Sequence, residues 1–517
     1  MPAAAPPPPL PPSAGLGPWL LGLGLAALAV GPALVAGEAP GHGLTDLWPA
    51  IWAFDEAARA FPGVVTHTER LAAPAGMAVW LAAPLKAWLF APFTLAFGAI
   101  PSFSLALGAA RAATVGLAAW AARGAGRGPA GQWAFAIAAG AAPFWWGPAW
   151  EGIVEGVDGW ALFLYLGAEA RRRRGLAAAA LGLCALSSWY LGAIAVFWLL
   201  VAAVADRRAL RAAPGLLLAA PALLAFLHAF PGVGADVPGL HAAMGSLHPP
   251  EPPFWARAAP AVFGRSPWPG PLPCLLAVAA ALRSRRAALL LGAAVLAAVL
   301  STGRGPWWAF PVLDWMRFPD RFLGAALVGV AAAAARAVDA LAATHPGRAR
   351  LLLVLLLADA LLLAPQPPVL PAGGRPDTTL LSGLPPGAIL LDLPGPLSLP
   401  PGAPNGSRAR ARAVLGAQLG TTLRSPFAPD FNGLAAADGL PGAPFGADPL
   451  LPGASAAIPP DLVAEGHQRG IHAVRVRGAE LGRRRAADLE QALSSNGFRE
   501  IARDGPTSLW AWPEPSR

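Results

Sequence analysis

The densest group of side chains suited to chemistry lies near the N-terminus, within residues 37–101. Its carboxylates and indoles are Asp46, Trp48, Trp52, Asp55 and Glu56. Trp48 and Trp52 are four residues apart, so they share one face if this stretch is helical. Flat aromatic rings beside a carboxylate suit sugar binding, because the rings cover C–H faces and a carboxylate accepts hydrogen bonds from hydroxyl groups. The alternative, which the composition favours, is that the tryptophans form an aromatic belt at a membrane interface.

A second group of carboxylates is formed by Glu151, Glu155 and Asp158. Their spacing of i, i+4, i+7 predicts one shared face of a helix. Such a face, at the outer mouth of a membrane span, is suited to bind acceptor hydroxyls or a cation. The alternative is a solvated helix start, where acidic side chains interact favourably with the helix dipole.

Two arginines form a third group in the segment Arg-Phe-Pro-Asp-Arg-Phe, residues 317–322. Arg317 and Arg321 are four residues apart, and guanidinium groups bind phosphate through paired hydrogen bonds. We therefore predict a phosphate site here, at the outer leaflet of a membrane. The alternative is that the two arginines pair with Asp314 and Asp320.

The composition is that of a membrane protein. Of 517 residues, 55% are hydrophobic and 13% are charged, and the mean hydropathy is +0.50. Soluble domains carry about 25% charged residues, so a soluble enzyme is excluded, and the apolar content excludes a disordered chain. The 38 basic and 29 acidic residues give a net charge of +9. Because the arginines cluster at the ends of apolar runs, we interpret this excess as positive-inside asymmetry and predict no nucleic-acid partner.

The cysteines and the two isolated basic residues of the apolar runs add little chemistry. Cys184 and Cys274 both lie inside apolar runs, which argues against a disulfide framework or a zinc site. No metal or other cofactor is predicted. Arg111 lies near the middle of an apolar run, and we expect it to have a buried partner. Lys86, the only lysine, is ambiguous in the same way.

The apolar runs predict a polytopic α-helical membrane protein. A span needs about 20 apolar residues. The candidate runs are 18–36, 79–98, 102–121, 131–149, 157–170, 175–204, 214–230, 271–283, 287–302, 320–342 and 350–365. Placing every arginine cluster in the cytoplasm requires residues 79–98 to lie at the outer face without crossing. It also requires residues 175–204 to divide at Ser187-Ser188 into two short helices.

This topology has about eleven transmembrane helices in the cytoplasmic membrane, with the N-terminus inside and the C-terminal domain outside. The predicted parts are a Pro-rich tail (1–17), the transmembrane domain (18–365), a linker (366–387) and an external α/β domain (388–517). The external loops are 37–101, 231–270 and 303–319. In the last domain, the apolar run 388–393 predicts a buried strand, and alternation predicts a half-buried strand at 472–477. Residues 480–495 predict a helix, and residues 498–502 and 508–512 predict two more strands.

Taken together, these features resemble the GT-C class of multi-pass glycosyltransferases. The resemblance rests on the acidic, Trp-containing first external loop, the Leu71-Ala-Ala-Pro74-Ala-Gly76 stretch with the Pro-containing helix after it, the 317–322 segment and the external C-terminal domain. It implies a polyprenyl-phosphate-linked sugar donor, an acceptor that is a glycan, lipid or protein, and a catalytic acidic residue in the first loop. Asp46 matches that position within Thr45-Asp46-Leu47, whereas the acidic doublet usual in the class occurs here as Asp55-Glu56.

The resemblance assigns roles to the residues above. Polyprenyl phosphate is a good leaving group, so one carboxylate acting as base on the acceptor suffices for inverting transfer. We predict Asp46 as this base, with Asp55 as the second catalytic candidate. The predicted phosphate ligands are Arg317 and Arg321, and the predicted substrate contacts are Trp48, Trp52, Glu56, Glu155 and Asp158.

Two other functions compete with transfer. A flippase or transporter of lipid-linked glycans predicts internal repeats and charges spread through several spans. The sequence shows no repeat, and Arg111 is the mid-span charge that we identify. A non-catalytic membrane scaffold, which uses the external domain to bind a partner, predicts that Asp46 and Asp55 are dispensable.

Overall fold

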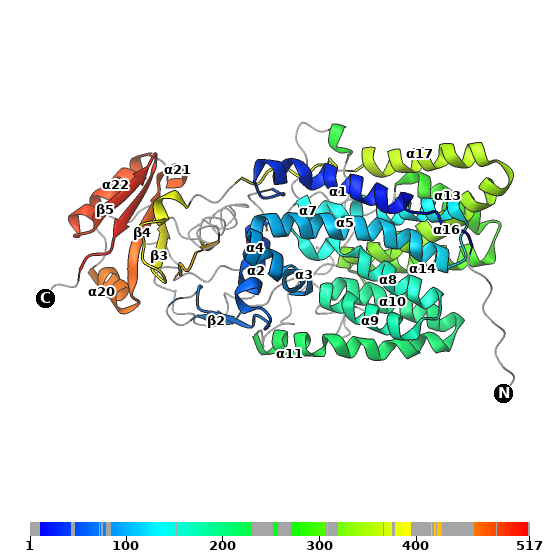
Figure 1. Ribbon diagram of the computed structural model, residues 1–517, viewed down its shortest axis with the longest axis horizontal. Helices are drawn as coiled ribbons and strands as arrows, with labels where there is room; N and C mark the ends of the chain where they lie inside the picture. The colour runs from blue at the N-terminus through cyan, green and yellow to red at the C-terminus, as the bar shows by residue number, and fades with distance from the viewer. Residues whose placement is uncertain are drawn as a thin grey trace.

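The chain folds into a bundle of apolar helices with a small sheet-containing domain at one end (Figure 1). The computed structural model describes residues 11–42, 47–71, 73, 76–78, 84–150, 152–229, 252–256, 270–305, 308, 319–364, 367–374, 378–393, 415, 418–419, 421–425, 460–481 and 483–514. The predicted loops 231–270 and 303–319 lie almost entirely outside these residues.

The apolar runs form the helices of the bundle. These are α1 Gly17–Ala36, α5 Ala99–Gly124, α6 Pro129–Phe135, α7 Pro143–Trp150, α8 Gly159–Ala170, α9 Arg174–Ser187, α10 Trp189–Ala205, α11 Ala220–Ala229, α13 Pro271–Ala281, α14 Arg285–Leu300, α16 Leu323–Thr344 and α17 Pro346–Leu362. A π-helical turn, Ala136–Gly140, follows α6, and a 3₁₀ segment, Arg207–Ala219, precedes α11.

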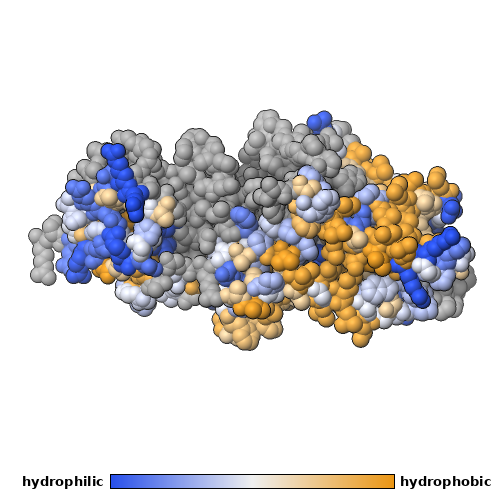
Figure 2. All heavy atoms as spheres, turned by 90° about the horizontal axis from the view of Figure 1, so that it is seen from above, coloured by the Kyte–Doolittle hydropathy of each residue, from blue (hydrophilic) through white to orange (hydrophobic). Residues whose placement is uncertain are grey.

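The surface of the bundle is apolar where lipid would meet it. Leu20 is 63% exposed, Leu289 66% and Val354 64%, and Figure 2 shows a broad hydrophobic surface over the helices. Within the described residues, three helices are long and apolar enough to cross a membrane: Gly17–Ala36, Ala99–Gly124 and Pro319–Thr344. The total of about eleven crossings stays a prediction.

The arginine-rich loops gather at one end of the bundle, away from the sheet-containing domain. The guanidinium carbon of Arg171, after α8, lies 3.8 Å from the ring centroid of Trp120 in α5. Arg127, after α5, lies 3.9 Å from the carboxylate of Asp339 in α16. Figure 2 shows hydrophilic residues at this end, beyond the apolar surface. The arginine-rich loops thus share one end of the bundle. That this end faces the cytoplasm stays a prediction.

The runs 79–98 and 175–204, which the positive-inside rule required not to form single crossings, both contain breaks. Residue Ser188 is extended (φ −168°, ψ 137°) between α9 and α10, which confirms the predicted break. The run 79–98 contains two short helices, α3 Pro84–Leu89 and α4 Ala91–Phe97. Phe93 and Phe97 in α4 are 46% and 63% exposed. Neither helix is long enough to span a membrane, and the placement of the pair at the outer face stays a prediction.

The predicted helical face at residues 151–158 is wrong. Helix α7 ends at Trp150, and Gly152 adopts a left-handed φ of 76°, which favours glycine. A 3₁₀ turn, Val154–Val157, follows before α8 begins at Gly159. Glu155 and Asp158 therefore do not share a continuous helix, and Glu151 lies outside the described residues.

The C-terminal domain is built on a four-stranded sheet. Its strands are β3 Ile389–Leu393, β4 Ile471–Arg477, β5 Arg499–Asp504 and β6 Thr507–Ala511, in the order β3-β4-β6-β5. Strands β3 and β4 are parallel, and the other two pairs are antiparallel. The helices are α20 Pro460–Gln468, α21 Gly478–Leu481 and α22 Arg483–Ser495. All four predicted strands are present, whereas α20 was not predicted.

The predicted linker is fixed against the end of α1 by backbone hydrogen bonds. The amide of Leu370 donates to the carbonyl of Ala29 (2.9 Å), and that of Gly373 donates to Ala39 (2.7 Å). In return, the amide of Gly41 donates to Pro371 (2.7 Å). The start of the first loop, the linker and the end of α1 thus form one junction between the two parts of the chain.

The topology can be tested with single cysteines at the two ends of the molecule. We expect Ser494→Cys, on exposed α22, to react with a membrane-impermeant maleimide in intact cells. Arg208→Cys, at the arginine-rich end, should react only after permeabilisation. The wild-type chain, with Cys184 buried and Cys274 half-buried, is the control. Equal labelling of both variants in intact cells would contradict the predicted orientation.

Candidate functional site

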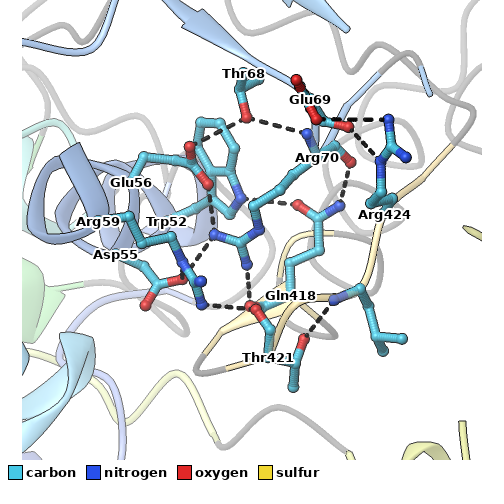
Figure 3. Close-up of polar contacts among 11 residues, drawn as sticks. Trp52, Asp55, Glu56, Arg59, Thr68, Glu69, Arg70, Gln418, Thr421 and Arg424 are labelled. Carbon is cyan, nitrogen blue, oxygen red and sulfur yellow. Dashed lines mark hydrogen bonds and ion pairs between the residues drawn. The ribbon is translucent and has the colours of Figure 1, made fainter. Parts of the chain in front are cut away.

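The acidic doublet of the first loop is buried and paired with arginine. Asp55 and Glu56 lie in α2, Leu47–Ala60, and are 8% and 6% exposed. Nη1 of Arg70 lies 2.8 Å from Oδ2 of Asp55 and also donates to Glu56. Arg59 pairs with Asp55 at 3.2 Å, and the hydroxyl of Thr68, in strand β1 His67–Thr68, donates to Glu56 (3.1 Å). Figure 3 shows both carboxylates turned toward Arg70.

Arg70 also connects the first loop to a distant segment of the chain. Its Nη2 donates to the backbone carbonyl of Gln418, and the side-chain amide of Gln418 donates to the carbonyl of Arg70 (2.6 Å; Figure 3). The indole of Trp52 donates to Oε1 of Gln418 (2.8 Å). These bonds tie α2 to residues 418–425.

Residues 424–425 in turn extend the C-terminal sheet toward the first loop. The amide of Leu390, in β3, donates to Arg424, and the amide of Arg424 donates to Ala388 (both 2.9 Å). On the other side, the amide of Ser425 donates to Arg70 (2.8 Å), and that of Ala73 donates to Ser425 (2.9 Å). A continuous set of backbone hydrogen bonds therefore runs from the sheet to the loop.

This network changes the interpretation of four predicted site residues. Trp48 and Trp52 are 0% and 1% exposed in the hydrophobic core, so neither ring presents a face to a sugar or to a membrane interface. Asp55 and Glu56 already accept hydrogen bonds from Arg70. Packing and positioning are the roles that these contacts support.

Asp46 lies outside the described residues. It directly precedes Leu47, the first residue of α2. The network around Arg70 fixes α2 and therefore fixes the point at which the chain carrying Asp46 enters the helix.

A buried ion pair lies where α3 meets the start of α8. The ammonium group of Lys86 lies 3.0 Å from Oδ1 of Asp158 and donates to the carbonyl of Val154 (2.8 Å). The indole of Trp160 donates to the same Asp158 oxygen (3.0 Å). The side chains of Lys86 and Asp158 are 5% and 1% exposed. Charges this deeply buried are retained only when they are paired.

A cavity of about 140 Å³ lies beside this pair. Its walls include Lys86, Asp158, Trp160, Ser187 and a face of α5 made of Ala106, Ala109, Ala110 and Ala113. The alanine spacing of i, i+3, i+4, i+7 keeps bulky side chains away from this face of the helix. Among the described atoms, Oδ2 of Asp158 and Oγ of Ser187 are buried without a hydrogen-bond partner. The cavity is mostly apolar, and these two oxygens with the ammonium group of Lys86 are the polar groups in its wall, which suits an amphiphilic ligand that carries hydroxyl or phosphate groups.

Of the two arginines predicted to bind phosphate, the structure describes one. Arg321 lies in the 3₁₀ turn Pro319–Phe322, and its guanidinium carbon is 6.0 Å from the ring centroid of Tyr190 in α10. Arg317 lies outside the described residues, as does Asp314. Glu155 lies in the 3₁₀ turn Val154–Val157, five residues after α7 ends at Trp150.

Arg111 and Asp359 are charged residues in the middle parts of predicted spans. Arg111 is buried in α5, donates to the carbonyl of Ala141 (3.1 Å) and lies over the ring of Trp146 (5.0 Å). This is the buried partner that we expected. Asp359, in α17, accepts a hydrogen bond from the amide of Leu272 at the start of α13. The prediction had missed Asp359, although it lies in the run 350–365.

Sequence reasoning also left Lys86 without a role. One feature of the sequence did distinguish Lys86. It is the only lysine among 38 basic residues, and the other 37 are arginines. In the described part of the chain, no group of three or more His, Cys, Asp or Glu side chains comes together that could hold a metal ion.

Comparison with solved structures identifies the fold. The chain matches the arabinofuranosyltransferase AftD from Mycobacteria with a TM-score of 0.57 and 15% identity, over 96% of this chain and 40% of that chain. It matches ArnT from Cupriavidus metallidurans in the apo state with a TM-score of 0.52 and 16% identity, over 98% and 100%. For ArnT bound to undecaprenyl phosphate, the values are 0.50 and 15%, over 97% and 100%.

These likenesses confirm the predicted GT-C fold. The chain spans less than half the length of AftD and matches the whole length of ArnT. No family model matches the chain, and no curated protein matches its sequence.

The network around Arg70 predicts an unequal response to the loss of two neighbouring arginines. Arg70→Ala leaves Asp55 and Glu56 buried without their shared partner, which costs about 3–5 kcal/mol. Arg59→Ala removes a side chain that is 36% exposed, and the loss of such a pair costs about 0–1 kcal/mol. Thermal unfolding of the detergent-purified chain should show a much larger fall in midpoint for Arg70→Ala. Equal falls would show that the network does not stabilise the junction.

Proposed function

We propose that this chain transfers a sugar from a polyprenyl-phosphate-linked donor to an acceptor at the outer face of the cytoplasmic membrane. The observation that carries the proposal is the GT-C fold, which the chain shares with AftD and with ArnT, a protein whose structure is known with bound undecaprenyl phosphate. The cavity beside Lys86 and Asp158 supplies a second support, because α3 of the first loop lines it and the ion pair places a cation and a carboxylate in its wall.

In this proposal, cationic side chains bind the phosphate of the donor. Lys86 lines the cavity and carries an ammonium group whose hydrogen-bond donors suit phosphate oxygens. Arg317 and Arg321, at the end of the third predicted external loop, remain our proposed phosphate ligands. As the bond between sugar and phosphate breaks, negative charge grows on the phosphate oxygens, and fixed cations stabilise that charge.

We propose Asp46 as the base that takes the proton of the acceptor hydroxyl. The contacts of Asp55 with Arg70 and Arg59 favour a positioning role for that residue. Asp46 acts in an inverting displacement, in which the acceptor oxygen attacks C1 of the sugar from the face opposite the departing phosphate. The proton moves to the Asp46 carboxylate, and the electron pair of the cleaved bond leaves with the phosphate.

The acceptor contacts are proposed to come from the segment between α7 and α8. Oδ1 of Asp158 is occupied by Lys86 and Trp160, which leaves Oδ2 to accept a hydrogen bond from an acceptor hydroxyl. Glu155 lies three residues earlier in the 3₁₀ turn and is proposed to extend this contact.

The two alternatives receive less support. A transporter predicts charges inside spans that serve a pathway. Arg111 and Asp359 are such charges, but each contacts a backbone group where a helix ends or begins. A scaffold function predicts that Asp46 and Asp55 are dispensable.

Mass spectrometry of co-purifying lipids tests the proposal. We expect the wild-type chain to retain polyprenyl phosphate and Asp46→Asn to accumulate the sugar-loaded form, because binding persists while proton transfer fails. Glu500→Gln, a surface substitution in β5 far from the cavity, is the matched acid-to-amide control and should behave as wild type. Bulk phospholipid alone in all three samples would support the scaffold alternative.

A further inference from the structure

Three arginines from different segments lie near one another at the arginine-rich end of the bundle, and two of them, Arg127 and Arg336, interact with the carboxylate of Asp339. Arg127 follows α5, Arg286 lies in the first turn of α14, and Arg336 shares α16 with Asp339. Nη1 of Arg127 lies 3.9 Å from Oδ2 of Asp339. All three guanidinium groups interact electrostatically with one another across the gap between these helices.

The carboxylate of Asp339 is already engaged by backbone amides. It accepts hydrogen bonds from the amides of Gly128 (2.9 Å) and Gly131 (2.6 Å), at the start of α6. Three positive groups and one negative group leave a net charge of 3 − 1 = +2 in this cluster. The side chains of Arg127 and Asp339 are 18% and 19% exposed, so water screens them only in part.

Arg127 is affected by burial and by the charges of both neighbours. Burial is the main cause that lowers the pKa of Arg127, and repulsion from Arg286 lowers it further, while Asp339 acts in the opposite direction. A half-buried cluster of this charge is stabilised by an anion that brings its own negative charge.

The apolar surface beside the cluster indicates what kind of anion this is. On α14, Leu289 is 66% exposed and lies three residues after Arg286, on the same face of the helix. Leu282, just before α14, is 84% exposed. Figure 2 shows hydrophilic residues next to the hydrophobic surface at this end of the bundle. A ligand with a charged phosphate and an acyl chain matches this arrangement, because the phosphate suits the arginine cluster and the chain suits the exposed leucines.

We propose that Arg127, Arg286 and Arg336 form a binding site for the headgroup of one anionic phospholipid, with its acyl chains along α14. The phosphate accepts paired hydrogen bonds from guanidinium groups, and basic pockets between membrane helices are suited to such headgroups. The site lies at the opposite end of the bundle from the Lys86 cavity and does not depend on the proposed function.

The competing explanation is a diffuse attraction between all the exposed arginines and an anionic membrane. Arg348 and Arg350, in the first turn of α17, are exposed at the same end and supply the matched control. Replacing either pair by glutamine removes the same charge from the same end. Only the Arg127/Arg286 pair belongs to the cluster around Asp339.

Native mass spectrometry of the delipidated full chain, titrated with phosphatidylglycerol or with phosphatidylcholine, tests the site. We expect one phosphatidylglycerol to bind wild type at least tenfold more tightly than phosphatidylcholine. The double variant Arg127→Gln/Arg286→Gln should lose most of this preference, while Arg348→Gln/Arg350→Gln should keep it. Equal losses in the two double variants would overturn the proposal in favour of a diffuse field.

Three further arms keep the test decisive. Arg286→Gln alone, at an exposed position, should weaken phosphatidylglycerol binding severalfold even if the double variant fails to fold. Asp339→Asn raises the net charge of the cluster, but its single oxygen accepts from only one of the amides of Gly128 and Gly131. Binding should therefore strengthen in this variant when its unfolding midpoint equals that of wild type. Inorganic phosphate should not compete at millimolar concentration. Full competition by phosphate, or weaker binding in Asp339→Asn at an unchanged unfolding midpoint, would overturn the assignment to a phospholipid.

Discussion

The buried ion pair between Lys86 and Asp158 is the interaction on which the candidate site depends. It joins α3, from the first loop, to the start of α8, and it places a cation and a carboxylate in the wall of one cavity. Such a pair contributes little net stability, but the loss of one partner leaves a buried charge that costs several kcal/mol. The alanine face of α5 leaves room beside the pair, and Trp160 fixes the carboxylate by its indole N–H. The charges are therefore held in place before any ligand binds, which is what stabilisation of a developing phosphate charge requires.

A second buried charge network holds the C-terminal sheet over the same end of the bundle. Arg70 contacts the acidic doublet of α2 on one side and Gln418 on the other, and the 424–425 segment continues the hydrogen bonding to β3. The doublet that resembles a catalytic pair in sequence is thus engaged in joining two parts of the chain. This arrangement leaves Asp46, at the entrance to α2, as the acidic residue of the first loop that we propose for chemistry.

The helices and strands could be predicted from the sequence, whereas most contacts between side chains could not. Apolar length and arginine placement predicted the helices and the break at Ser188, because lipid burial and charge exclusion act on each segment separately. The first strand of the C-terminal domain was predicted from its continuous apolar run, and the second from alternation. The partners of buried charges were not predictable, because they lie far away along the chain. Arg70 and Gln418 are 348 residues apart, and Lys86 pairs with Asp158 of a different helix. The helical face through Glu155 and Asp158 failed because the spacing rule ignored three glycines within residues 152–159, which allow the chain to turn.

The central claim is that the cavity beside Lys86 receives the phosphate end of a polyprenyl-phosphate-linked donor. A polyprenyl phosphate with a photoreactive group on its first isoprene unit tests this claim directly, because irradiation marks the residues that it touches. We predict adducts on α3 and on the Ala106–Ala113 face of α5 in the wild-type chain, and their loss in Lys86→Met. Adducts spread along the exposed faces of α14 and α17, and unchanged in Lys86→Met, would contradict the account.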